Sequence, residues 1–413
     1  MSNSETVKTV KRRRVFYIPG YDPFHPRRYR ELYRKEAAAQ AAISGYEIAL
    51  TPKTTKGPYG WHVTSVQDDH QVESDIEVLV WSDLVRDSMS NSIPATYLQL
   101  ARTAWIYIGS GALFRLMRLR KGPVIAALYP VAMLLAQLAL AILAFWLCLQ
   151  VAGLASTILT EFGATLVGAI GGAVAAVFVL RWFRARDGKF FAYYLMHDYA
   201  HTAQNRGAIP NDLRERLESF GDAIAGALQD PVDEVLVVGH SSGAHLGVSV
   251  LAELVRAGRV PAGGPALSFL TLGQVVPMVS FLPDAHELRA DLRDLCQSDL
   301  LTWLDVTAPG DGCAFALCDP VSVSGVAPEG KRWPLVISAA FTQTLSPETW
   351  QTLRWRFFRL HFQYLCAFDK PGDYDYFRIT AGPLTLGERF YGRAPSKSRI
   401  EKAVSRFTSV AAA

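Results

Sequence analysis

Residues 235–243 read Val-Leu-Val-Val-Gly-His-Ser-Ser-Gly, an apolar run of strand-forming residues that ends in a Gly-x-Ser-x-Gly motif. The helical pattern that follows, at 244–254, is rich in small residues that let a helix pack closely on a sheet. Such a motif can occur by chance in a chain with 31 glycines, but chance does not explain the strand before it and the helix after it. We therefore expect a strand, a sharp turn that exposes the hydroxyl of Ser241, and a helix packed behind that turn.

Strand-like and helix-like patterns alternate along most of the chain. The segments that read as strands, besides the one before Ser241, are 14–18, 46–50, 61–66, 76–81, 267–272, 301–306 and 335–341. The segments that read as helices are 26–44, 93–120, 190–204, 212–228 and one that begins with a capping serine and a proline at Ser346-Pro347. This alternation predicts an α/β fold with a doubly wound, mostly parallel sheet.

Two long stretches of the chain carry no charged residue, at 123–153 and 162–180. Each is at least as long as the roughly 17 to 25 residues that a membrane-spanning helix needs. Two buried core helices are the alternative, but core helices rarely stay apolar on every face for such a length. We expect a transmembrane helical hairpin, with helices at about 123–150 and 162–181, inserted into the α/β domain.

The charges beside the two apolar stretches predict their orientation. Arginine and lysine precede the first stretch, at 115–121, and follow the second, at 181–189, whereas the link at 157–161 has neither. The positive-inside rule then puts both flanks in the cytoplasm. No secretory signal is apparent, because the basic residues at 8–14 precede only a short apolar run. We expect a multi-pass protein, as of a bacterial inner membrane, with both termini cytoplasmic.

The expected insertion divides the chain into three parts. The N-terminal part of the α/β domain takes 1–110, the hairpin takes 111–189, and the C-terminal part of the α/β domain takes 190–413. Small residues recur at every fourth position of the second apolar stretch; they are Ala164, Gly168, Gly172 and Ala176. This stripe allows close packing, either between the two helices of the hairpin or in a homo-oligomer.

Composition narrows the partners and the compartment. The formal net charge is only +4, and the basic residues gather at the N-terminus and beside the apolar stretches. This pattern favours contact with the anionic headgroups of a lipid bilayer over nucleic acid. Five cysteines, an odd number with Cys148 inside an apolar stretch, do not suggest a disulfide framework and suit a reducing compartment.

With its strand, its Gly-His-Ser-Ser-Gly turn and its helix, the chain resembles the α/β-hydrolase superfamily, in which this turn is the nucleophile elbow. A serine hydroxyl is a weak nucleophile and needs a base that an acid orients. The resemblance implies the chain order serine, acid, histidine. The histidines after Ser241 are His245, His286 and His361. His245 points away along the elbow helix and His286 precedes the expected acid, so His361 is the expected base.

The acid is expected after the strand at 301–306. The family places it in the turn after such a strand, which favours Asp311 over Asp305 within the strand, and Asp319 and Asp284 remain alternatives. By the same resemblance, the oxyanion hole takes one amide from Ser242 and a second from the turn after the first strand. Members of the family often have His-Gly at that turn; here it is Pro19-Gly20, so the second donor is either Gly20 or Tyr21.

The resemblance implies a serine hydrolase that needs no organic cofactor and no metal. His197 and His201 have the spacing of metal ligands on a helix but lack a third ligand, and Cys313 and Cys318 lack a second pair. We expect a membrane-anchored enzyme that cleaves a carboxylic ester. An acyl-lipid ester is favoured because a membrane-held site meets lipids at high effective concentration. The alternative is a noncatalytic membrane scaffold that retains the fold.

Overall fold

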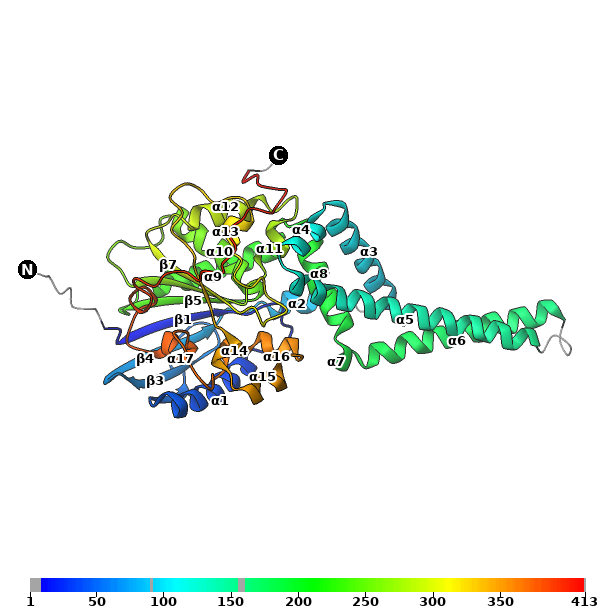
Figure 1. Ribbon diagram of the computed structural model, residues 1–413, viewed down its shortest axis with the longest axis horizontal. Coiled ribbons are helices and arrows are strands. Elements are labelled where there is room, and N and C mark those ends of the chain that lie inside the picture. Colours follow the sequence, from blue (N-terminus) through cyan, green and yellow to red (C-terminus); the bar gives the residue numbers. More distant parts are fainter. Residues whose placement is uncertain (1–8, 90–91, 155–159, 412–413) are drawn as a thin grey trace, which may run out of the picture. The chain divides into compact units, whose positions relative to one another are not determined.

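The computed structural model describes residues 9–89, 92–154 and 160–411, and its strands form one eight-stranded sheet in the order β2-β3-β4-β1-β5-β6-β7-β8 (Figure 1). The strands are β1 (Arg12–Ile18), β2 (Glu47–Pro52), β3 (Gly60–Gln67), β4 (His70–Val78), β5 (Glu234–His240), β6 (Ala266–Leu272), β7 (Leu301–Thr307) and β8 (Leu335–Ser338). The neighbouring strands β4, β1, β5, β6, β7 and β8 pair in parallel in that order, and β3 pairs antiparallel with both β2 and β4. The fold is α/β with a mostly parallel sheet, as the alternating patterns predict.

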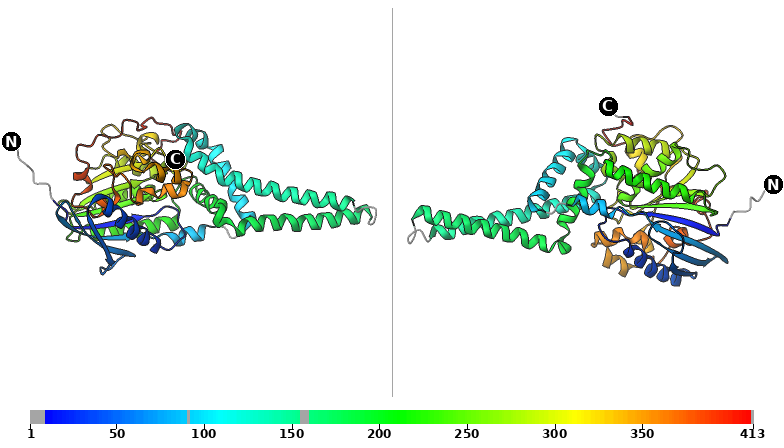
Figure 2. Two further views of the ribbon diagram at one scale, coloured as in Figure 1. Left: turned by 60° about the horizontal axis from the view of Figure 1, so that its bottom comes forward. Right: turned by 180° about the vertical axis from the view of Figure 1, so that it is seen from behind.

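Helices cover both faces of this sheet (Figure 2). Those at or between its strands are α1 (Arg27–Ser44), α2 (Ser82–Ser88), α4 (Ala112–Leu119), α9 (Asn211–Ala227), α10 (Ser242–Arg256), α11 (Val276–Ser280), α12 (His286–Leu295), α13 (Pro320–Val323), α14 (Phe341–Thr344), α15 (Pro347–Leu353), α16 (Phe357–His361), the 3-10 helix η1 (Gln363–Leu365), α17 (Tyr376–Ala381) and α18 (Leu386–Arg389). Every residue of β5 is buried, as in a parallel strand covered on both sides.

The two faces of the sheet use alternate residues of β1. Val15 and Tyr17 join the core beneath α1, where they lie in one cluster with Tyr33. Helix α10 packs on the other face, so closely that a Cβ on Gly247 would lie 2.7 Å from the ring of Phe269 in β6. The small residues after the Gly-x-Ser-x-Gly motif therefore serve the close packing expected of them.

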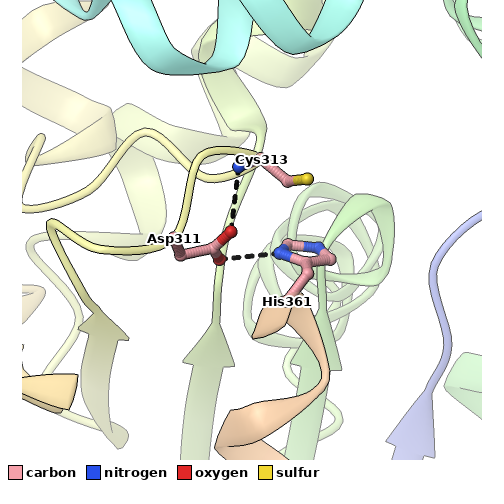
Figure 3. A group of neighbouring side chains, drawn as sticks. All are labelled: Asp311, Cys313 and His361. Carbon is pink, nitrogen blue, oxygen red and sulfur yellow. Dashed lines mark hydrogen bonds and ion pairs between the residues drawn. The ribbon is translucent and has the colours of Figure 1, made fainter. Parts of the chain in front are cut away.

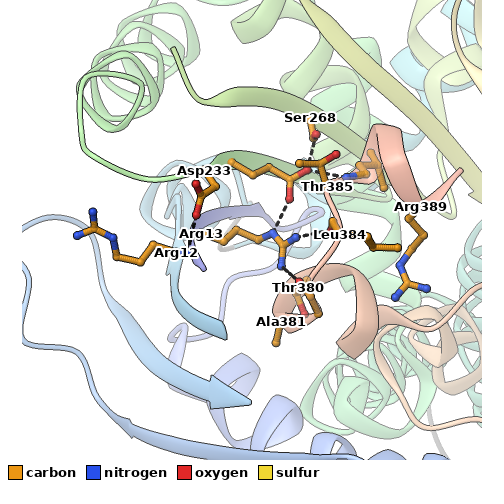
Figure 4. Close-up of polar contacts among 12 residues, drawn as sticks. Arg12, Arg13, Asp233, Ser268, Thr380, Ala381, Leu384, Thr385 and Arg389 are labelled. Atoms are coloured by element: carbon orange, nitrogen blue, oxygen red, sulfur yellow. Dashed lines mark hydrogen bonds and ion pairs between the residues drawn. The ribbon is translucent and has the colours of Figure 1, made fainter. Parts of the chain in front are cut away.

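A buried ion pair joins the amino ends of β1 and β5 (Figure 4). Nε of Arg13 donates to Glu234 at 2.5 Å, and both side chains are fully buried. The guanidinium also donates to the carbonyl oxygens of Gly382 and Leu384, and Glu234 accepts from the hydroxyl of Ser268. This network ties the segment around 382–386 to the sheet, at the edge opposite to the carboxyl ends of the strands.

The chain divides into two compact units. The sheet unit comprises 1–86, 110–123 and 205–413, and the second unit comprises 87–109 and 124–204. The helices that lie in the second unit, or enter it, are α3 (Ile93–Gly109), α5 (Lys121–Leu154), α6 (Glu161–Ala185), α7 (Asp187–Phe190) and α8 (Ala192–Ala203). Within it, α3 packs on α8, around a core that contains Leu134 and Met196. The second unit thus contains most of the expected insertion, together with α3 and α8.

Helices α5 and α6 are long and apolar enough to cross a membrane. They have 34 and 25 residues, and their most apolar windows have mean hydropathies of 2.4 and 2.1. Large apolar side chains such as Leu154, Phe162 and Phe178 are mainly exposed on them, as they would be in contact with lipid. The residues 155–159, which belong to the expected link, lie outside the described residues.

The small-residue stripe of α6 packs against α5. A Cβ on Gly168 would lie 2.9 Å from Cβ of Ala152, and one on Gly172 would lie 2.7 Å from the ring of Phe145. Glycine at these two positions lets the helices approach within a distance that a larger residue would prevent. Packing between the two helices of the hairpin is one of the two roles expected for the stripe. The other, contact between subunits of a homo-oligomer, stays a prediction.

Three elements differ from the sequence-based expectation. The single helix expected at 93–120 is two helices, α3 and α4, because Gly111 takes a left-handed conformation (φ 73°) that interrupts the helix. The strand expected at 335–341 ends at Ser338, where the chain turns and α14 begins. The strand expected at 76–81 begins earlier, at His70, because β4 pairs along its length with β3.

Candidate active site

Ser241 occupies a strained turn between β5 and α10. Its backbone has φ 56° and ψ −119°, which a residue with a side chain rarely adopts. Both glycines of the motif are required by close contacts: a Cβ on Gly239 would lie 2.6 Å from the carbonyl oxygen of Gly243, and one on Gly243 would lie 2.0 Å from that of Ile18. The chain therefore makes the sharp strand-to-helix turn that the motif predicts.

The turn after β1 lies directly against Ser241. A Cβ on Gly20 would be 3.0 Å from Cβ and 3.4 Å from Oγ of Ser241, and the indole of Trp81 donates to the carbonyl oxygen of Pro19 at 3.0 Å. Within the described part of the chain, the amides of Gly20 and Ser242 donate no hydrogen bond. Two of the expected oxyanion donors thus lie next to the serine and remain available to a ligand, while Tyr21 is buried beside them.

Asp311 lies in the loop after β7, with its side chain fully buried. One carboxylate oxygen, Oδ1, accepts from the amide of Cys313 at 2.9 Å. The other, Oδ2, accepts from Nδ1 of His361 at 2.7 Å (Figure 3). Oδ2 also accepts from the hydroxyl of Tyr364 at 3.0 Å. Three donors compensate the buried carboxylate, and one of them is the expected base.

Tyr364 is a part of this site that sequence reasoning missed. Its hydroxyl donates to Asp311 and accepts from the amide of Ala308 at 2.9 Å, so it links the loop after β7 to η1. Burial raises the pKa of Tyr364 well above its ordinary value, so the hydroxyl keeps its proton for Asp311. The sequence offered one signal for Tyr364: it follows His361 by three residues, a spacing that places two side chains on the same face of a helix.

The end of β6 brings the serine and the histidine to one place. The carbonyl oxygen of Leu272 accepts from the amide of Ser241 at 2.9 Å. The next residue, Gly273, has φ 54°, and a Cβ on it would lie 3.0 Å from Cε1 of His361 and 2.7 Å from the ring of Tyr364. A side chain at this position would be strained by the backbone conformation and would come too close to the ring of Tyr364. No sequence motif marks Gly273.

The carboxyl ends of β1, β5, β6 and β7 lie side by side in the sheet. The chain leaves β1 toward the side of the sheet that holds β2, β3 and β4, and it leaves β5 toward β6 on the opposite side. The carboxyl ends of β1 and β5 therefore form a topological switch point. Open α/β sheets bind their ligands at such a point. The expected nucleophile, base, acid and oxyanion donors all come from segments that follow the strands β1, β5, β7 and β8 in the chain.

The alternative acids are engaged elsewhere. Asp305 is buried within β7 and accepts from the hydroxyl of Thr271 at 2.6 Å, and burial raises its pKa to about 8. Asp319 caps α13 and pairs with Lys331, and Asp284 pairs with Arg206. Among these carboxylates, Asp311 is the one that the structure pairs with His361.

The two histidines with metal-ligand spacing lie on α8, outside this site. Nδ1 of His197 and the side-chain oxygen of Gln99 are 2.8 Å apart, and burial lowers the pKa of His197 to about 4. His201 lies within 3.5 Å of Gln204. Both histidines have partners in the second unit.

Known proteins offer no guide to this site. Comparison with family models, with curated proteins and with solved structures finds no match to the chain. The case for its function therefore rests on the geometry of the residues around Ser241.

Proposed function

We propose that this protein is a membrane-anchored serine hydrolase of the α/β-hydrolase type, which cleaves a carboxylic ester through an acyl-enzyme. One observation carries the proposal: the strained Ser241 lies against Gly20 and is hydrogen-bonded to Leu272, and the next residue, Gly273, lies close to the ring of His361, which pairs with Asp311. A nucleophile, a base and an acid that orients the base, together at one sheet edge, are the parts that acyl transfer requires.

The proposed reaction begins with attack of Oγ of Ser241 on the ester carbonyl carbon. His361 accepts the hydroxyl proton on Nε2, because its Nδ1 is held by Asp311. The carbonyl oxygen becomes an oxyanion, which the amide of Ser242 and an amide of the turn at 20–21 stabilise. His361 then donates the proton to the departing alcohol, and the acyl group stays on Ser241.

Hydrolysis of the acyl-enzyme repeats these steps with water as the nucleophile. His361 takes a proton from the water, and the carboxylic acid leaves as Ser241 regains its proton. Asp311 stays ionised throughout and stabilises the imidazolium that forms in each half of the reaction. Every proton that leaves one group is accepted by another, so the cycle needs no further reactant.

The start of the first apolar helix lies against the loop that carries the acid, which supports a substrate from the membrane. A pocket of about 430 Å³ within the sheet unit is lined by 117–123, from the end of α4 into α5, and by residues at 309–316 that include Asp311. The guanidinium of Arg120 donates to the carbonyl oxygen of Ala316 at 2.9 Å. A site anchored to the bilayer would meet esters that reside there at a high effective concentration.

Covalent labelling with a fluorophosphonate probe tests the proposal. The full chain, purified in detergent, should be labelled at Ser241, and Ser241→Ala should prevent labelling. Ser249→Ala is the matched control, because Ser249 lies on the same helix and bonds to Asp291; that variant should label normally. A folded wild-type protein that resists the probe would favour a noncatalytic scaffold. Equal labelling of Ser241→Ala would show that another residue reacts with the probe and would reject Ser241 as the nucleophile.

A further inference from the structure

The loop that carries the acid also brings a thiol to the site. Asp311, Cys313 and His361 each offer one ligand atom, and these three atoms lie within 4.8 Å of one another (Figure 3). Three or more side chains of histidine, cysteine, aspartate or glutamate with this spacing could hold one metal ion. Among the residues 9–89, 92–154 and 160–411, no other such group is found. The proposed hydrolytic mechanism uses two of the three and makes no use of the Cys313 side chain.

Nitrogen, sulfur and oxygen donors of these types form tetrahedral zinc sites. Ligands at zinc bond lengths lie roughly 3.5 Å apart, so the three atoms need to move by only about 1 Å to enclose an ion. The amide of Cys313 donates to Oδ1 of Asp311 and fixes the loop backbone beside the acid.

Cys313 differs from the other cysteines of the sheet unit. It is half-buried, whereas Cys296, Cys318 and Cys366 are buried. Burial raises the pKa of each of those three thiols to about 12, which disfavours the thiolate that a metal needs. Cys313 is therefore the thiol of this unit that is open enough for an ion to reach.

We propose that Asp311, Cys313 and His361 form a reversible inhibitory site for Zn²⁺ or a similar thiophilic divalent cation. An ion on Nδ1 of His361 takes the place of the hydrogen bond to Asp311 and fixes the neutral imidazole as the tautomer with its proton on Nε2. That nitrogen then has no lone pair to accept the proton of Ser241, so His361 cannot act as a base. Binding releases the thiol proton, while the imidazole proton moves from Nδ1 to Nε2.

The inhibition rests on the proposed hydrolase function, but the binding of the ion does not. The full chain in detergent is first treated with EDTA and a phosphine reductant and then desalted. Hydrolysis of p-nitrophenyl butyrate is measured as Zn²⁺ is added. Wild type should lose activity and regain it with EDTA.

A matched pair of cysteine variants identifies the ligand. Cys313→Ser should hydrolyse the ester without zinc and need at least about tenfold more zinc for inhibition, since loss of even an outer partner of a ligand costs roughly 10- to 100-fold in affinity. Cys148→Ser removes the other half-buried cysteine, in α5, and should stay as sensitive as wild type. Equal zinc sensitivity of wild type and Cys313→Ser would overturn the proposal.

Cobalt binding separates this proposal from the hydrolase function. Co²⁺ should give a thiolate-to-metal charge-transfer absorption in wild type and in Ser241→Ala, and none in Cys313→Ser. An inactive wild type that shows this pattern would keep the metal site and reject the hydrolase. An active enzyme that shows neither the absorption band nor inhibition by zinc would keep the hydrolase function and reject the metal site. Loss of activity with EDTA and its recovery with zinc would overturn the inhibitory role.

Discussion

Nε2 of His240 donates a hydrogen bond to the backbone carbonyl oxygen of His361 at 3.0 Å, and the two rings lie 4.8 Å apart. The residue before Ser241 thus holds the backbone of the proposed base. Burial lowers the pKa of His240 to about 3, so its ring is neutral near pH 7 and keeps the proton that this bond requires. His240 is therefore a positioning residue, and strand β5 places both partners of the proposed proton transfer.

Replacement of His240 by phenylalanine should lower kcat by about 10- to 100-fold, because a base displaced by about 1 Å loses its alignment with the serine. KM should change little. His240→Gln keeps an N–H donor and should recover much of the rate, which a purely structural defect would not allow. Steady-state kinetics of both variants, with the pH profile of kcat/KM, make the comparison; a wild-type rate in His240→Phe would contradict the positioning role.

Ser241→Ala should abolish ester hydrolysis and leave the fold and the membrane insertion intact. The change removes the proposed nucleophile and only one small polar group, although alanine must still adopt the strained conformation at φ 56°. Turnover and thermal unfolding are measured on the same preparation. Hydrolysis at the wild-type rate in this variant would rule out Ser241 as the nucleophile.

Asp311→Asn should lower kcat by about 10⁴-fold with a small effect on stability, as expected when a base loses the acid that sets its tautomer. The contacts from Cys313 and Tyr364 can still be made to the amide oxygen in part. Turnover of an activated ester, together with the midpoint of urea unfolding, tests both statements. A variant with nearly normal rates would move the acid role to another residue.

Asp305→Asn is the matched control for that variant. Burial raises the pKa of Asp305 from 3.8 to about 8, so the folded state holds a proton that the unfolded state releases. The free energy of unfolding should then fall as the pH rises from about 4 to about 8, and the asparagine variant should lack this fall. Its turnover should stay near wild type. A collapse of kcat in Asp305→Asn would contradict this assignment.

Arg13→Met should destabilise the sheet unit by about 3 to 5 kcal/mol, because it leaves the buried carboxylate of Glu234 without its counter-charge. The double variant Arg13→Met/Glu234→Leu should recover much of that loss, since it removes both charges. Chemical unfolding followed by tryptophan fluorescence measures the difference. Equal stabilities of wild type and Arg13→Met would show that the pair contributes little.

Reporter domains fused after residue 413 and inserted in the link at 156–161 should lie on opposite sides of the membrane. The basic residues on both flanks of the two apolar helices predict a cytoplasmic C-terminus and a link on the far side. Compartment-specific reporter activity in intact cells makes the measurement. Both reporters on one side would exclude a spanning hairpin.

The sequence alone determined the features that are local in the chain. The turn at Ser241 follows from two glycines between an apolar strand and a small-residue helix, and α5 and α6 follow from two charge-free stretches. The approximate bounds of β1, β5 and β7 follow in the same way. Each of these depends on neighbours within a few residues, which a pattern records.

The tertiary structure decided which distant residues meet. It paired His361 with Asp311 rather than with another carboxylate, showed that Gly273 must lack a side chain, and placed Tyr364 and Cys313 around the acid. The contacts of Asp311 with His361 and Tyr364 join segments about fifty residues apart in the chain. The pairing of β6 with β7 brings Gly273 and Asp311, which follow these strands, to neighbouring places in the sheet. The periodicity of the sequence shows that strands and helices form, but it does not record which distant segments meet.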